Sequence, residues 1–332
     1  MELMETLSIA WSPSGRGLAV GSMASAIVWT RAGARRIPKI GTAPIYAMAF
    51  SPSEARLALG GESKTARILD RAGKSVAKLA GDSGIVNHVS FDSKGRVLAG
   101  RAIWDEEGEV VARKRFSMMS VFIHDDLIAG AAPSYESDLA SPRVTLLSTD
   151  GGLLAESPLP TPLTHVTTDG THLAVAAGPD VVVLDTLGKE LGRFRRHASG
   201  HGVSGLSIRG ERIASGGHGD TSIWVTAFDG SSRLVLPGYA RPTQHQGLSF
   251  APHRSALLAA LAGALGRGGG GDRVTLFDLE SGMRVELLAS GDRWLAVDEQ
   301  GRYTGDSTLS SSALKETPEL LEALFPSDAT SV

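Results

Sequence analysis

The stretch Trp11-Ser12-Pro13-Ser14-Gly15 decides the fold, because similar segments recur along the chain. Each copy is a β-rich stretch that ends in an aromatic or aliphatic residue and is followed by a polar turn. The clearest further copies begin at Phe50, Phe91 and Phe250, and weaker copies begin at Ile123, Val166 and Ile208. The spacing of roughly 30 to 45 residues indicates structural repeats, and about seven of them fit in the chain.

Each repeat continues with three more short strands. A second, aliphatic strand closes on small residues, as in Ile213-Ala214-Ser215-Gly216, and a third strand follows, as in Val181–Asp185. A glycine turn such as Arg71-Ala72-Gly73 supplies the positive φ of a tight hairpin and leads into a fourth strand. Four short antiparallel strands per repeat, with few helices, are typical of a propeller blade. We therefore expect an all-β fold, a β-propeller of about seven four-stranded blades.

These repeats resemble the WD-repeat propeller family over nearly the whole chain. Gly200-His201 stands where that family has its Gly-His pair, and Trp104-Asp105 is the one literal Trp-Asp. The aspartate persists without the tryptophan at Asp70, Asp185 and Asp278. The resemblance implies a divergent, bacterial-type member in which His201 bonds within its own blade.

The segment Trp294–Ser307 carries a second resemblance. It looks like the segment that follows bacterial propellers fused to caspase-like peptidases or other effector domains. After it, Thr317 can cap a helix, Pro318 suits the first helical position and Pro326 ends the helix, so we predict a short helix here. Its apolar face is expected to dock on the propeller or on a partner, and is formed by Leu320, Leu321, Leu324 and Phe325.

These signals divide the chain into two parts. We expect residues 1–290 to form the propeller, and residues 291–332 to form a C-terminal hairpin and short helix packed on it or extending from it. Without cysteine the chain has no disulfide or thiolate chemistry, and its net charge of -3 exerts no general pull on nucleic acid or an anionic membrane. The first ten residues lack the features of a signal peptide, so we expect a cytoplasmic protein with no membrane segment.

Histidines and arginines of the later blades fall in loops that the repeat places at one end of the propeller. The predicted binding residues are Arg195, Arg196, His197, His218, Asp220, Arg241 and His245. If the guanidinium groups cluster, they favour a carboxylate, a phosphate or an acidic partner segment. The histidine spacing shows no short ligand pair of the kind found in zinc motifs, so we predict neither a metal nor a cofactor.

Several other motifs have structural interpretations. Gly81-Asp82-Ser83-Gly84 looks like a serine-protease nucleophile, yet no histidine precedes Ser83, so we interpret it as a turn. The glycines of 266–271 have dinucleotide-loop spacing, but a strand follows instead of a helix, so we predict a loop between the middle strands of the last blade. We assign Trp29, Trp104 and Trp224 to packing between blades. The polar insertion 133–142 is long enough to be a binding loop.

Three functions remain open. The favoured one is a non-enzymatic scaffold, monomeric by itself, that binds a protein partner through its loop face or central channel. That partner would be an effector encoded separately. The alternative is a propeller hydrolase or lyase with carboxylates or histidines converging at the axial funnel. A weaker alternative is binding of nucleic acid or a phosphate ligand through the arginine-rich loops.

Overall fold

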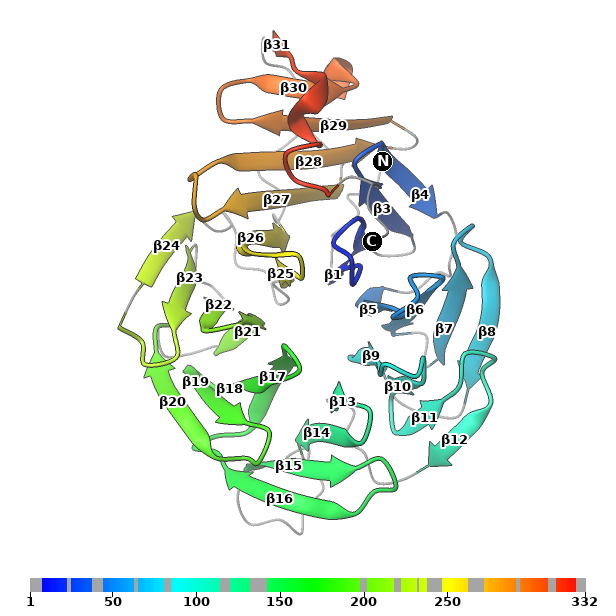
Figure 1. Cartoon of the computed structure of the whole chain (residues 1–332), viewed down its shortest axis with the longest axis vertical. Helices are drawn as coiled ribbons and strands as arrows, with labels where there is room; N and C mark the ends of the chain where they lie inside the picture. Colours follow the sequence, from blue (N-terminus) through cyan, green and yellow to red (C-terminus); the bar gives the residue numbers. More distant parts are fainter. Residues whose placement is uncertain are drawn as a thin grey trace, which may run out of the picture.

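The strands of the computed structural model form seven sheets, which stand in chain order around a central axis (Figure 1). The structure describes residues 8–22, 25–37, 44–62, 65–80, 85–113, 120–131, 142–197, 202–217, 222–231, 233–237, 247–261, 272–290, 293–309 and 315–326. The first strand of each sheet lies nearest the axis, and neighbouring first strands contact one another around the whole ring. Each sheet is one blade.

Blades 1 to 6 are four-stranded and antiparallel, with the strands adjacent in chain order. Blades 1 to 3 consist of β1 (Ser8–Trp11), β2 (Leu18–Gly21), β3 (Ala26–Thr30) and β4 (Gly33–Ile37); β5 (Ile45–Phe50), β6 (Arg56–Gly61), β7 (Thr65–Asp70) and β8 (Ser75–Ala80); and β9 (Val89–Phe91), β10 (Val97–Ala99), β11 (Ala102–Trp104) and β12 (Val110–Arg113). Blades 4 to 6 consist of β13 (Val121–His124), β14 (Leu127–Ala131), β15 (Arg143–Ser148) and β16 (Leu153–Pro158); β17 (Leu163–Thr168), β18 (His172–Ala177), β19 (Asp180–Asp185) and β20 (Glu190–Arg195); and β21 (Val203–Arg209), β22 (Arg212–Gly217), β23 (Ser222–Ala227) and β24 (Arg233–Pro237).

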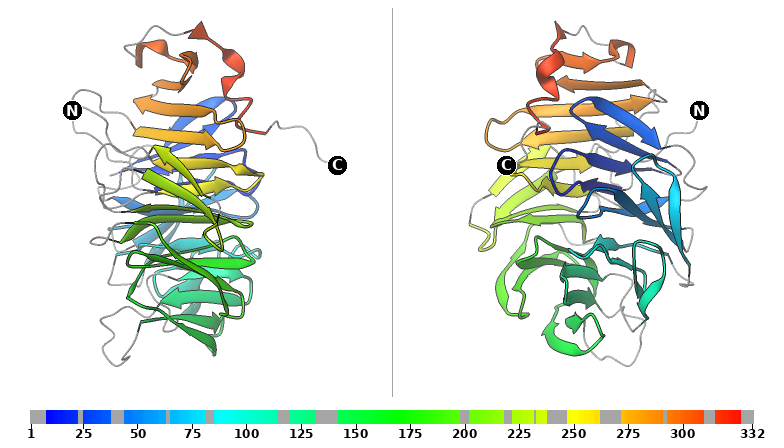
Figure 2. Two further views of the ribbon diagram at one scale, coloured as in Figure 1. Left: turned by 90° about the vertical axis from the view of Figure 1, so that its left-hand side faces the viewer. Right: turned by 45° about the vertical axis from the view of Figure 1, so that its right-hand side comes forward.

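Blade 7 is a seven-stranded sheet that projects beyond the ring (Figures 1 and 2). Its strands are β25 (Leu248–Ala251), β26 (Arg254–Leu261), β27 (Asp272–Asp278), β28 (Arg284–Ser290), β29 (Arg293–Asp298), β30 (Arg302–Gly305) and β31 (Lys315–Glu316). The last pair, β30 and β31, is parallel, whereas the others are antiparallel. The predicted loop 266–271 lies outside the described residues.

Two details of the predicted architecture need correction. The chain was expected to form about seven four-stranded blades, but only six sheets have four strands, because β29 pairs with β28 along six residues and continues the last sheet outward. The predicted C-terminal helix is wrong as well. Residues Pro318–Leu320 form one 3-10 turn, followed by further turns up to Phe325, and a second 3-10 turn covers Ser307–Leu309. The segment that ends at Pro326 is too short for its helical hydrogen bonds to offset the cost of nucleating an α-helix.

The core lies between the blades. In blade 5 every residue from Val181 to Leu184 is buried, because blades 4 and 6 cover both faces of β19. This third strand is therefore buried on both faces. The tryptophans of the third strands behave largely as predicted: Trp29 and Trp104 are buried, and Trp224 is partly buried.

The turn between the third and fourth strands packs against the preceding blade. Gly73 has a φ of +82°, and a Cβ at this position would lie 2.7 Å from Ile37 of blade 1. Gly33 has a φ of +114°, and a Cβ here would lie 2.3 Å from Trp294, which belongs to β29. At the seam where the ring closes, the turn between β3 and β4 of blade 1 thus packs against β29, the fifth strand of blade 7.

The C-terminal turns complete that seam. Leu320, Leu321, Leu324 and Phe325 are buried in one apolar cluster with residues of blades 1 and 7. The predicted docking of this apolar face on the propeller is confirmed. An ion pair of 2.7 Å joins Arg31 in blade 1 to Glu322 in the C-terminal turns. No helix among the described residues is long and apolar enough to cross a membrane.

Candidate functional site

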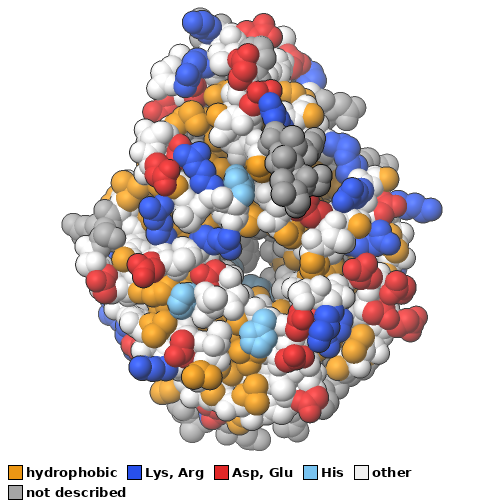
Figure 3. All heavy atoms as spheres, viewed as in Figure 1, with side chains coloured by type: hydrophobic (Ala, Val, Ile, Leu, Met, Phe, Trp, Pro, Cys, Tyr) orange, Lys and Arg blue, Asp and Glu red, His pale blue; other side chains and the backbone are white. Residues whose placement is uncertain are grey.

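A cavity among the described residues forms a channel along the propeller axis. It has a volume of about 520 Å³, and all seven blades contribute residues of, or next to, their first strands. A space-filling view shows the ring hollowed at its centre (Figure 3). We call the end of the ring at which first strands begin the loop end, and the opposite end, at which first strands turn into second strands, the turn end.

Two histidines from different blades meet in this channel. His88 directly precedes β9 of blade 3, and His165 lies near the start of β17 in blade 5. Their ring centroids are 5.2 Å apart, with the ring planes tilted by 59°. Burial lowers the pKa of His88 from 6.5 to about 4, because water no longer stabilises the imidazolium form. His88 is therefore neutral at pH 7.

Tyr46 is the third titratable side chain of the channel wall. It stands at the second position of β5, near the loop end. Partial burial raises its pKa, and the nearby Glu62 carboxylate raises it further, because both disfavour a phenolate. The phenol consequently stays protonated at neutral pH and offers a hydrogen-bond donor.

Sequence reasoning missed the two histidines, although the repeat contains a signal for them. His88 precedes Phe91 by three residues, and His165 precedes Thr168 by three. Phe91 and Thr168 are the last residues of equivalent first strands. Aligning the repeats position by position places both imidazoles at one level of the ring. The alignment could not give the distance between the two imidazoles. They come from the blades on either side of blade 4, whose first strand is only four residues long.

The described members of the predicted binding cluster do not converge on one point. The Nε and Nη2 atoms of Arg195 donate to the carboxylate of Asp180 on the neighbouring strand, at 2.9 and 2.8 Å. Arg196 instead donates to the carbonyl oxygen of Gly230 in blade 6, at 2.8 Å. His218, Asp220, Arg241 and His245 lie outside the described residues, as do the insertion around Pro133 to Ser141 and Gly81 to Gly84.

His197 lies inside the propeller rather than on its surface. It is buried, and its Nε2 atom is 3.0 Å from the hydroxyl oxygen of Ser215 on β22. This contact holds the connection that follows blade 5 against the second strand of blade 6. The resemblance had implied such a structural histidine at His201, which lies outside the described residues.

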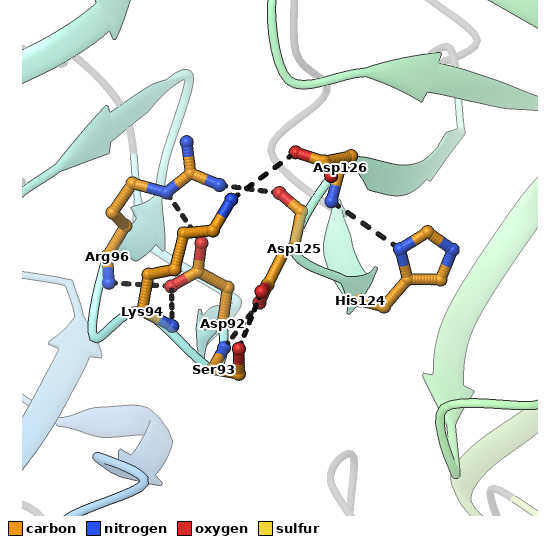
Figure 4. A network of polar contacts seen from close by, with 7 residues as sticks. All are labelled: Asp92, Ser93, Lys94, Arg96, His124, Asp125 and Asp126. Atoms are coloured by element: carbon orange, nitrogen blue, oxygen red, sulfur yellow. Dashed lines mark hydrogen bonds and ion pairs between the residues drawn. The ribbon is translucent and has the colours of Figure 1, made fainter.

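At the turn end of the ring, the carboxylates of two aspartates accept several hydrogen bonds. The carboxylate of Asp92 accepts bonds from the backbone N–H groups of Lys94 and Arg96, and from the Arg96 guanidinium at 2.6 Å (Figure 4). Asp125 of blade 4 accepts bonds from the backbone and hydroxyl of Ser93, which lower the pKa of Asp125. These bonds join the first turns of blades 3 and 4, so we assign them to stability.

Metal chemistry receives no support from the described part of the chain. No group of three or more His, Asp or Glu side chains there is arranged to hold an ion. The paired imidazoles of the channel offer two nitrogen ligands, one fewer than catalytic zinc sites use.

Comparisons with known proteins bear on the fold. No known family model matches the sequence, and no curated protein matches it. Among solved structures, the chain is similar to the β-propeller domain of Cps50 (Swd1) from Myceliophteria thermophila. The TM-score is 0.65 at 15% sequence identity, and the match covers 84% of this chain and 98% of that chain. The likeness shows the β-propeller fold. At this identity it carries no information on partners.

Proposed function

We propose that this chain is a divergent WD-repeat-like propeller that acts as a non-enzymatic interaction scaffold, binding a protein partner at the loop end of its axial channel. The observation that carries the proposal is the channel itself, a polar and apolar cavity of about 520 Å³. Concave sites of a few hundred Å³ on a rigid framework are typical binding sites. A closed ring of seven sheets supplies that framework.

The loops around this mouth belong to the same proposed surface. β20, β22 and β24 all end at the loop end, because successive strands of a blade are antiparallel. Arg195 is the last residue of β20, and the chain segments that contain His218, Asp220, Arg241 and His245 follow β22 and β24 in the sequence. We propose that these segments contact the partner around the channel mouth.

The proposed partner is an effector protein encoded separately, which binds to a monomeric cytoplasmic propeller. The support is the likeness of Trp294–Ser307 to the segment that links bacterial propellers to effector domains. In this proposal residues 1–290 form the propeller and residues 291–332 extend its last blade.

The test is affinity capture from the native host with the full chain and two variants of equal bulk. Asn87→Trp narrows the channel near the loop end, and Lys78→Trp adds the same side chain on the exposed outer strand of blade 2. We expect a stoichiometric partner that the wild-type protein and Lys78→Trp retain and Asn87→Trp loses. A partner retained equally by all three proteins contradicts the channel mouth as the binding site.

The pair of imidazoles favours one other candidate, an enzyme that uses the channel for proton transfer. A neutral His88 beside His165 can accept a proton at pH 7, as a general base must. The check is a panel of ester and glycoside substrates with wild-type protein, His88→Gln and the exposed control His124→Gln. Turnover that only His88→Gln abolishes would support the enzyme.

A further inference from the structure

The lining of the axial channel carries no formal charge among its described residues. Charged side chains make up 21% of the sequence, yet no Asp, Glu, Lys or Arg is among the described residues that line this cavity. Lys, Arg, Asp and Glu side chains are instead spread around the ring on the face shown in Figure 3. A ligand inside the channel therefore meets no acidic, lysine or arginine side chain among the described residues.

Three polar side chains of the channel wall have no hydrogen-bond partner among the described residues. The side chains of Asn87, Thr167 and Ser249 make no hydrogen bond to any residue that the structure describes, and all three line the channel. They come from blades 3, 5 and 7, so they surround the cavity. An amide and two hydroxyls offer both donors and acceptors.

The imidazole pair adds two further polar side chains to the channel wall. Burial keeps His88 uncharged at pH 7, and its ring faces that of His165 at 5.2 Å. A cation there would meet no described carboxylate, and an anion would meet no described ammonium or guanidinium group.

Aromatic side chains stand at the turn end of the channel. Phe50, Phe91 and Phe250 each close a first strand or stand next to its end, and all three line the cavity. Trp11 stands among them and donates its indole N–H to the Ser249 carbonyl oxygen at 3.1 Å. Near the turn end the channel wall thus combines these aromatic rings with the hydroxyls of Thr167 and Ser249, whereas Asn87 and Tyr46 lie nearer the loop end.

We propose that the channel receives a short, uncharged polypeptide segment of the partner, inserted from the loop end. This inference rests on the proposed function and names the chemistry that the site selects. Main-chain amides and Asn, Gln, Ser or Thr side chains match the free donors and acceptors, while an apolar side chain at the tip meets the aromatic residues. A charged side chain is excluded because it loses its hydration and finds no opposite charge to replace it.

The experiment uses a displayed library of random peptides, selected on the full-length protein. Enriched peptides are then titrated against Ser249→Asp and Ser249→Lys, which put a charge of either sign on the channel wall. The control Lys78→Glu changes charge on the outer strand of blade 2. We expect peptides poor in Asp, Glu, Lys and Arg, a loss of affinity of at least tenfold with both Ser249 variants, and no change with the control.

Each other result overturns a stated part of the proposal. Affinity that rises with one sign of charge and falls with the other shows a charged segment and contradicts the chemical class. Peptides insensitive to both variants contradict the channel as their site but leave a peptide-binding scaffold standing. A selection without any binder contradicts the proposed function as well. Thr167→Asp and Thr167→Lys repeat the test on another blade, should the Ser249 variants unfold.

Discussion

The indole ring of Trp11 and the phenyl ring of Phe325 lie 5.5 Å apart, tilted by 48°, so the first strand of the ring packs directly against the last described turn of the chain. No strand is exchanged between the two ends of the chain among the described sheets. Closure between blades 7 and 1 therefore depends on side-chain packing at this seam, where β29 and the C-terminal turns contact blade 1.

Removing the Phe325 ring should weaken that seam. Its side chain is 1% exposed. We expect Phe325→Ala to lower the free energy of unfolding by about 3–5 kcal/mol, the usual cost of emptying a buried phenyl site. The control is Ala323→Ser on the exposed side of the same turns, which should change it by less than about 0.5 kcal/mol. Urea denaturation compares them, and equal stability of the two variants would show that the turns do not close the ring.

The glycine turns allow a second test of the seam. Gly33 in blade 1 and Gly282 in blade 7 both have positive φ, but a Cβ at Gly33 meets Trp294, whereas one at Gly282 has no neighbour within 4 Å. Alanine at Gly282 should cost only the backbone strain of roughly 1 kcal/mol. Alanine at Gly33 should cost about 1–3 kcal/mol more, because Trp294 must shift. Thermal unfolding that ranks the two variants equally would contradict the contact.

Contacts within a turn and contacts between a turn and the neighbouring blade differ in how far the sequence predicts them. The turn glycines and the aspartates after first strands are visible in the repeat, because they satisfy their own backbone locally. Trp294 as the partner of Gly33 is not visible, since it joins residues at opposite ends of the chain. The extended last blade was missed for a related reason: the pattern of Trp294–Asp298 predicts a strand but does not say which strand it pairs with.

The candidate site shows the same limit. The repeat predicted that the loops of the later blades lie at one end of the propeller, because strand direction follows from strand count, and β20, β22 and β24 do end on the same side of the ring. It could not show that Arg195 binds Asp180 or that His197 points inward to Ser215. Nor could it distinguish first-strand residues that line the axis from those that pack between blades. That distinction depends on the twist and radial placement of the sheets.

The buried carboxylate of Asp92 should be important for stability at the turn end. Its side chain is fully buried and binds two backbone N–H groups and the Arg96 guanidinium. We expect Asp92→Ala to cost about 3 kcal/mol, because Arg96 and both backbone groups lose their partner. Asp125→Ala removes a partly exposed carboxylate and should cost less than about 1 kcal/mol. Chemical denaturation at pH 7 measures both, and a reversed order would refute this assignment.

The neutral state of His88 makes a prediction about pH. Its pKa is about 4 in the folded protein and 6.5 in the unfolded chain, so the unfolded chain binds more protons between these values. The free energy of unfolding should therefore fall as pH drops from 6.5 towards 4, by an amount on the order of 3 kcal/mol. Below pH 4 His88 is protonated in both the folded and the unfolded chain, and the stability that the neutral imidazole contributed at pH 7 is fully lost.

Replacing the imidazole isolates that effect. His88→Gln cannot titrate, so its stability should change less than that of the wild-type protein between pH 7 and pH 4.5. The exposed His124→Gln variant should follow the wild-type curve. Urea denaturation at several pH values gives the slopes, and parallel curves for wild type and His88→Gln would mean that His88 is not held neutral by burial. Because the same neutral ring lines the proposed peptide channel, that result would also remove one support for an uncharged ligand.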